Sequence, residues 1–191
     1  TYLMSFAVDD KRETIYVMSS DKKVDVYSRS GKYIRSIPLK KYGGNFQEIE
    51  VYNSYLFVSE FINIGRAKYN WIIIDSTGTL ISQKKNSILP FSTGMVGGGG
   101  LYKHGNTLSY WNLYNDTVFT VLPDFSIKAS ILLSPGKYRI PRSHFSTDQF
   151  AHFFIPYKLF ETNRFLVFNY AFSQRITIAL IEKVSKKSYL S

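Results

Sequence analysis

Short runs of apolar residues, separated by polar and turn-forming residues, recur along this chain of 191 residues. Four runs follow turn residues and are apolar at consecutive positions, which is typical of β-strands that bury both faces. These runs are residues 13–18, 54–59, 106–111 and 163–168. A second predicted strand follows each of them, at residues 24–27, 71–74, 118–121 and 176–181. No stretch has the apolar spacing of an amphipathic helix, so the pattern predicts a chain built from strands.

Each pair of strands is extended on both sides into a unit of four. Candidate first strands lie at residues 4–8, 47–52, 100–103 and 153–159. In the first two units a tight turn with Gly31 or Gly78 leads into a more polar fourth strand, at 32–38 or 79–84. Glycine provides the positive φ that such a turn requires. The third unit has Pro123-Asp124-Phe125-Ser126 at this place, which is also a turn composition.

The four-strand unit returns about every 40 to 57 residues, a period typical of propeller blades. We therefore predict an all-β fold, a β-propeller of four-stranded antiparallel blades. The predicted blades lie at 3–39, 46–86, 99–133 and 153–191, within a single partial propeller domain. A β-sandwich would not repeat one four-strand unit in register. Helical repeats are excluded because the period inside each unit is two.

Composition supports strands and limits the chemistry. The chain has 15 Tyr and 15 Phe, residues that favour pleated, half-buried surfaces. It has no cysteine, which excludes disulfides, thiolate catalysis and cysteine-bound metals. The formal net charge is +10, but the 24 Lys and Arg are mostly spread along the chain, as on an ordinary solvated surface. No apolar run approaches the roughly 20 residues of a membrane-spanning helix.

Two segments carry a resemblance to a known family. They are Asn115-Asp116-Thr117-Val118-Phe119 and Gly136-Lys137-Tyr138-Arg139-Ile140-Pro141, and the units 24–39 and 165–187 are similar to blades of the same family. The chain resembles the six-bladed, NHL-like β-propellers that Gram-negative gut bacteria export, often as lipoproteins. The resemblance implies export to the periplasm or outer cell surface, with a lipid anchor in the full-length protein as an open alternative. It implies no shared catalytic residues.

The resemblance also implies more blades than this chain contains. A ring of six blades needs about 250 residues or more at this repeat length, and four units are present here. We expect the chain to be a partial ring. Unpaired strand edges favour pairing with another chain, so we also expect dimer formation through the open blades.

Other unusual residues yield only weak chemical hypotheses. The segment Gly97–Gly100 could hold a phosphate through its backbone N–H groups, but it lacks the lysine and the helix of a P-loop. The alternative is an inner strand where neighbouring backbone leaves no room for side chains. His144 and His152 flank Asp148 at a spacing that matches no standard zinc motif. We expect no metal and no other cofactor.

Catalytic patterns are also missing. The 14 acidic residues are scattered, and most of them belong to predicted turns rather than to a facing pair of the kind that cleaves glycosidic bonds. No Gly-x-Ser-x-Gly motif occurs. We therefore predict no catalytic residue.

Propellers bind ligands with the loops at one end of the ring, which here are residues 40–46, 61–70, 87–97, 112–115 and 134–152. The last of these is long, and long loops are often functional. Aromatic rings beside arginines could stack on sugars or peptides, although packing between blades also uses aromatic rings. The predicted ligand-binding residues are Arg139, Arg142, His144, His152, Arg66, Tyr69 and Trp111.

The sequence leads to one function hypothesis and one alternative. The hypothesis is a non-catalytic, exported propeller that binds a protein, peptide or glycan ligand at the cell envelope. The alternative is a propeller hydrolase or lyase whose catalytic residues lie partly on missing blades. Nucleic-acid binding through the basic surface is disfavoured because the aromatic RNA-binding motif is missing.

Overall fold

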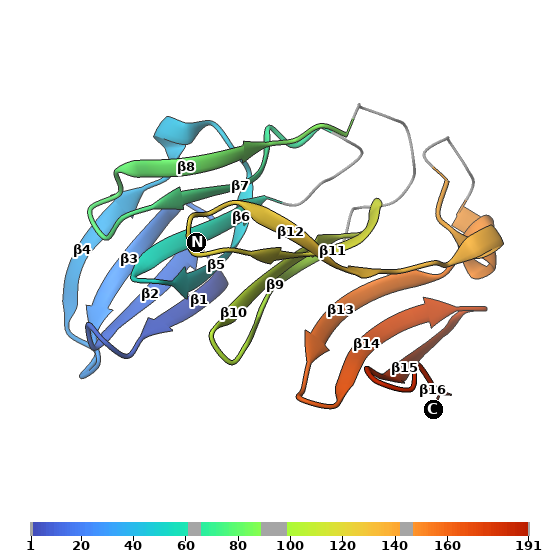
Figure 1. Ribbon diagram of the computed structural model, residues 1–191. Helices are drawn as coiled ribbons and strands as arrows, with labels where there is room; N and C mark the ends of the chain where they lie inside the picture. Colours follow the sequence, from blue (N-terminus) through green and yellow to red (C-terminus); the bar gives the residue numbers. More distant parts are fainter. Residues whose placement is uncertain (1, 61–65, 89–98, 142–146, 191) are drawn as a thin grey trace. The chain divides into compact units, whose positions relative to one another are not determined.

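The computed structural model describes residues 2–60, 66–88, 99–141 and 147–190. Their strands form four sheets, each with four antiparallel strands in chain order (Figure 1). Blade 1 contains β1 (Leu3–Asp9), β2 (Thr14–Ser19), β3 (Lys23–Ser28) and β4 (Tyr33–Pro38), and blade 2 contains β5 (Phe46–Tyr52), β6 (Tyr55–Glu60), β7 (Tyr69–Ile74) and β8 (Leu80–Lys85). Blade 3 contains β9 (Gly99–His104), β10 (Thr107–Asn112), β11 (Asn115–Val121) and β12 (Ile127–Leu132), and blade 4 contains β13 (Ile155–Glu161), β14 (Phe165–Phe172), β15 (Arg175–Glu182) and β16 (Ser188–Leu190). The predicted propeller of four-stranded blades is confirmed.

The chain divides into two compact units. Unit 1 is Thr1–Phe61 with Ala67–Ile88 and holds blades 1 and 2, whereas unit 2 is Ile62–Arg66 with Leu89–Ser191 and holds blades 3 and 4. In each unit the first strands of the two blades lie side by side, β1 with β5 and β9 with β13. That all four blades form a single domain stays a prediction.

Helical structure is confined to three 3₁₀ segments in the part of the chain that the structure describes. They are η1 (Lys40–Tyr42), η2 (Gly136–Tyr138) and η3 (Thr147–His152). The connection from β12 to β13, which the sequence analysis treated as a plain loop, contains both η2 and η3. The strand predictions agree with the structure to within a few residues. The last strand, β16, has three residues and pairs with β15.

Unit 1 is held together by an apolar core between its two blades. Alternate residues of blade 1 point into it, among them Tyr16, Met18 and Val26, and blade 2 contributes Leu56 and Ile72. All five are buried. A four-stranded sheet cannot bury an apolar face by itself, so each blade depends on its neighbour.

Only one face of β2 is fully buried, contrary to the prediction of burial on both faces. Ile15 and Val17 point away from the core and stay partly exposed. Side chains alternate between the two faces of a strand, and the core of unit 1 contacts only the face that carries Tyr16 and Met18.

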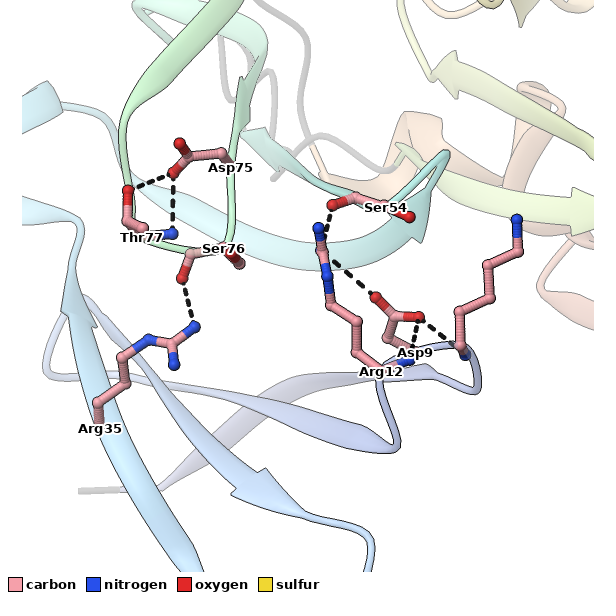
Figure 2. Close-up of polar contacts among 8 residues, drawn as sticks. Asp9, Arg12, Arg35, Ser54, Asp75, Ser76 and Thr77 are labelled. Atoms are coloured by element: carbon pink, nitrogen blue, oxygen red, sulfur yellow. Dashed lines mark hydrogen bonds and ion pairs between the residues drawn. The ribbon is translucent and has the colours of Figure 1, made fainter.

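Polar contacts join the two blades of unit 1 at two places (Figure 2). Asp9 is buried and accepts hydrogen bonds from the backbone N–H groups of Lys11 (3.1 Å) and Arg12 (3.2 Å). The Arg12 guanidinium pairs with the Asp9 carboxylate and donates to the carbonyl oxygen of Ser54 in blade 2. At the outer edge, Arg35 of β4 donates to the carbonyl oxygen of Ser76 at 2.6 Å.

The outer turn of blade 2 has further partners next to Ser76. Lys41 donates to the carbonyl oxygen of Gly78 at 2.7 Å, and the Tyr42 hydroxyl donates to the same oxygen. Arg35 of blade 1 and two side chains of η1, the segment after blade 1, therefore hold the β7–β8 turn. This closes the outer edge of the interface between the blades.

The turn between the third and fourth strands has the same form in blades 1, 2 and 3. Its fourth residue donates a backbone hydrogen bond to its first and has positive φ: Gly31 (84°), Gly78 (86°) and Phe125 (67°). The predicted glycine turns are confirmed. The two glycines differ in the room around them for a side chain. A Cβ added at Gly31 would meet no atom within 4 Å, whereas one added at Gly78 would lie 2.6 Å from Cγ2 of the buried Ile37.

Replacing these two glycines separates backbone strain from crowding. Gly31→Ala carries only the strain of a positive φ, so we expect it to lower the free energy of unfolding by about 1–2 kcal/mol. Gly78→Ala also forces a methyl against Ile37, and we expect it to cost about 1–3 kcal/mol more. Urea unfolding of both variants measures the difference. Equal losses would contradict the close approach of Gly78 to Ile37.

The side chain of Asp75 stabilises the β7–β8 turn. Hydrogen bonds from the Thr77 hydroxyl (2.6 Å) and from the backbone N–H groups of Thr79 and Thr77 (both 2.8 Å) hold the pKa of Asp75 below its ordinary value. A carboxylate with a lowered pKa stabilises the fold above its unfolded pKa of about 3.9, and this contribution is lost as the pH falls through the lower folded value.

We therefore expect Asp75→Ala to destabilise the protein at pH 7. The loss of stability should become smaller as the pH is lowered below 4. Thermal unfolding of both proteins from pH 7 down to pH 2.5 checks this. Gly31→Ala, which removes no charge, is the control and should cost the same at both ends of the range. A constant difference for Asp75→Ala would contradict the role of the ionised carboxylate.

Candidate functional site

Three connections meet at one end of unit 2. They are the turn between β10 and β11, the β12–β13 connection, and the turn between β14 and β15. Leu133 donates a backbone hydrogen bond to Asp116 (2.6 Å), and Ser173 donates to Ala151 (3.0 Å). A further backbone bond from Phe154 to Tyr138 (2.8 Å) closes the connection on itself. These bonds hold the residues of η2 and η3 beside the ends of the strands.

Arg139 is the charged centre of this end. Its guanidinium Nη2 lies 3.0 Å from Oδ2 of Asp116, at the beginning of β11, and the arginine side chain is 51% exposed. A cavity of about 20 Å³ lies against this pair and is lined also by Trp111, Leu113 and Ile140. That is room for about one water molecule. One carboxylate thus positions the guanidinium, while solvent can still reach it.

Aromatic rings continue the surface beside Arg139. Tyr138 is 43% exposed and packs edge-to-face on Phe172, with ring centroids 5.1 Å apart. The ammonium group of Lys137 lies over the Tyr138 ring, 5.2 Å from its centroid. Phe154 packs below, 4.7 Å from the ring of Tyr170. An exposed ring with a cationic group over it can bind a planar or anionic group.

The structure places the predicted ligand-binding residues in different surroundings. Arg139 and His152 are exposed in the β12–β13 connection, and Arg66 is exposed at the end of the β6–β7 connection. Arg142 and His144 lie outside the described residues. Tyr69 is buried in the core of unit 1, 6.3 Å from the stacked ring of Phe46, and Trp111 is buried in the core of unit 2. Their rings contribute to packing, and their ligand contacts stay predictions.

Two other sequence features have structural roles. Gly99, the first residue of β9, lies where a Cβ would be 2.9 Å from the carbonyl oxygen of Trp111. This is the close backbone approach that the sequence offered as an alternative to a phosphate site, and Gly97 and Gly98 lie outside the described residues. His104 hydrogen-bonds to Asn163 of blade 4 at 3.0 Å. Within the described ranges, no three acidic or histidine side chains gather as metal ligands.

Sequence reasoning missed two members of this end. Asp116 is not among the predicted ligand-binding residues, but it is the ion-pair partner of Arg139, 23 positions later in the chain. Tyr138 was noted only as part of the family signature. Both residues belong to the two signature segments, so that resemblance was the signal that could have identified them.

The fold agrees with the comparison of the sequence with known families. The whole of residues 1–191 matches the family described as a 6-bladed beta-propeller, and the chain belongs to it. The sequence matches none of the curated proteins. No helix among the described residues is long and apolar enough to cross a membrane.

Solved structures share the fold at low sequence identity. A Bacteroides fragilis NCTC 9343 protein described as exported is 19% identical, with a TM-score of 0.74 over 99% of this chain and 57% of its own. BamB from Moraxella catarrhalis is 10% identical, with a TM-score of 0.59 over 98% and 52%. A catalytically inactive virginiamycin B lyase from Staphylococcus aureus is 13% identical, with a TM-score of 0.56 over 98% and 54%. The chain thus spans little more than half the length of these proteins.

The ion pair between Arg139 and Asp116 should contribute little to folding. Both side chains are partly exposed, and exposed pairs contribute roughly 0–1 kcal/mol. We expect Asp116→Asn to change the free energy of unfolding by less than about 1 kcal/mol, as measured by urea titration. A loss well above this range would show that the pair is part of the framework and not a means of positioning Arg139.

Proposed function

We propose that this chain is part of an exported, non-catalytic propeller that binds a carboxylate-bearing peptide, protein or glycan at the cell envelope. The observation that carries the proposal is the end of unit 2 around Arg139. A guanidinium that is half exposed and held by Asp116 through Nη2 has further N–H donors that a ligand carboxylate could accept from.

The neighbouring side chains suit the same kind of ligand. The exposed Tyr138 ring lies next to Arg139 in the chain, and Lys137 adds a second cation above that ring. His152 is exposed in the same connection. A ligand with a carboxylate and a flat or apolar portion could contact the guanidinium and the ring together.

Export is proposed from the resemblance of the sequence to exported six-bladed propellers and from the Bacteroides fragilis protein that shares the fold and is described as exported. The virginiamycin B lyase gives no argument for activity in this chain, because at 13% identity the similarity shows a common fold and nothing more. Propellers carry many unrelated functions, so function has to be argued from the site.

The proposal can be tested with immobilised acidic polymers of both ligand kinds. Polygalacturonate and poly-glutamate serve as probes, with dextran as the neutral control. We expect the protein to bind at least one acidic polymer, with affinity that falls as salt is raised. Arg139→Gln should weaken this binding about tenfold, the size of one charge-assisted hydrogen bond.

The matched control is Arg29→Gln, which removes an exposed arginine from the β3–β4 turn of blade 1. It lowers the net charge equally but lies in unit 1, so it should leave the affinity unchanged. Equal weakening by the two variants would mean binding through net charge alone. Absence of binding to both acidic polymers would contradict the proposal.

A further inference from the structure

A groove of about 840 Å³ opens between blades 3 and 4 of unit 2. One wall comes from β12 and the residues after it, including Ile131 and Leu133, and the other comes from β14 and β15, including Phe168 and Ile181. Tyr138 and Phe154 close it at the end that carries Arg139. The volume lies within the range of about 300–1,000 Å³ that small-molecule sites occupy.

The equivalent place in unit 1 is closed, which shows what opens the groove. Counting from the shared turn, Ile37 and Leu39 of blade 1 correspond to Ile131 and Leu133 of blade 3. The first two are buried, at 1% exposure each, whereas Ile131 and Leu133 are only partly buried.

Sequence differences at the outer edge explain the contrast. By strand pairing, Arg35, which lies opposite Val26, corresponds to Lys128, which lies opposite Thr120. After the strands, Lys41 and Tyr42 correspond by the same count to Pro135 and Gly136. Arg35, Lys41 and Tyr42 donate hydrogen bonds to the outer turn of blade 2. Lys128 is exposed, and Pro135 and Gly136 have no side-chain donor. Unit 2 therefore lacks the two donors that Lys41 and Tyr42 provide in unit 1, and the interface opens towards its outer edge.

The walls of the groove restrict what can bind in it. They are the faces of two sheets, and the face of a sheet presents side chains while the backbone N–H and C=O groups point along the sheet. A peptide backbone or a sugar placed there would bury polar groups without partners, which is costly. Ser130, Ser134 and Ser188 are the polar uncharged residues among the lining residues, so the body of an occupant must be mainly apolar.

Charge is confined to one end of the groove. Lys183 and Lys186 are the charged residues among its lining side chains, and both lie in the turn between β15 and β16. No carboxylate lines the groove in the described part of the chain. The Lys183 ammonium forms an ion pair with Glu161, with Nζ 2.7 Å from Oε1, while Lys186 is exposed. An anionic group at this end of an apolar body would complement the lysines.

We propose that this groove is a second binding site, which takes an amphiphilic carboxylate. The alkyl or ring portion packs between Ile131, Leu133, Phe168 and Ile181, and the carboxylate lies at Lys186. This site shares Tyr138 with the surface around Arg139, but its contacts to the tail and the carboxylate do not depend on the function proposed for that surface.

The test is calorimetry of the whole chain with octanoate, decanoate and dodecanoate, each below its micelle concentration. Each added methylene should strengthen binding by about three- to fourfold, since the tail is removed from water. The uncharged 1-decanol should bind more weakly than decanoate. Binding that does not change with chain length, or no binding of dodecanoate to the folded protein, would overturn the proposal.

Lysine variants test the position of the carboxylate. Lys186 has φ of 60°, which asparagine tolerates, so Lys186→Asn should fold normally. It should weaken dodecanoate binding about three- to tenfold and leave 1-decanol binding unchanged. Lys187→Asn is the matched control, because Lys187 is the next residue and does not line the groove. Equal effects of the two variants would overturn the assignment.

A groove-filling variant tests the position of the tail. Ile131→Trp should abolish binding of both dodecanoate and 1-decanol while circular dichroism shows an intact sheet signal. Full binding by a folded Ile131→Trp protein would place the ligand elsewhere. If this variant does not fold, the chain-length series and the lysine pair still decide the proposal.

Discussion

The structure depends on one constraint, which is that a four-stranded sheet can bury its apolar side chains only against another sheet. In unit 1, Tyr16 and Met18 of blade 1 are buried because Leu56 and Ile72 of blade 2 pack against them. Unit 2 repeats the arrangement, with Val118 of blade 3 and Leu166 of blade 4 in one core. Every other feature of the fold either supports this packing or uses the surface that remains.

Polar contacts decide how completely two blades close. In unit 1, hydrogen bonds join the two blades near the first strands, from Arg12 to Ser54, and also at the outer edge, from Arg35 to Ser76. In unit 2 they act near the first strands. There the Tyr102 hydroxyl donates to Glu161 at 2.8 Å, and burial, followed by this carboxylate, raises the pKa of Tyr102. At the outer edge, Pro135 and Gly136 take the places of Lys41 and Tyr42 and have no side-chain donor.

The side chains of unit 2 that could bind a ligand lie at the end formed by the long β12–β13 connection. Side chains along the strands are used for packing, as Trp111 and Tyr170 illustrate. The β12–β13 connection is not part of a sheet, so its side chains can face solvent while η2 and η3 fix its backbone. Arg139 combines both properties, because Asp116 of β11 orients it and about half of its surface stays accessible.

The sequence by itself determined the features that depend on neighbours in the chain. The strands, the turns at Gly31 and Gly78 and the four-strand repeat follow from local conformational preferences and alternation, so they could be predicted. Which aromatic rings are buried, which carboxylate pairs with Arg139, and where an interface stays open depend on residues far apart in sequence. Tyr69 and Trp111 occur in strands whose composition suits both a core and a surface, and only packing placed them in the cores. The groove depends on residues from Ser130 to Leu190, and only the tertiary structure brings its two walls together. The missing donors at Pro135 and Gly136 matter only when another blade lies opposite them.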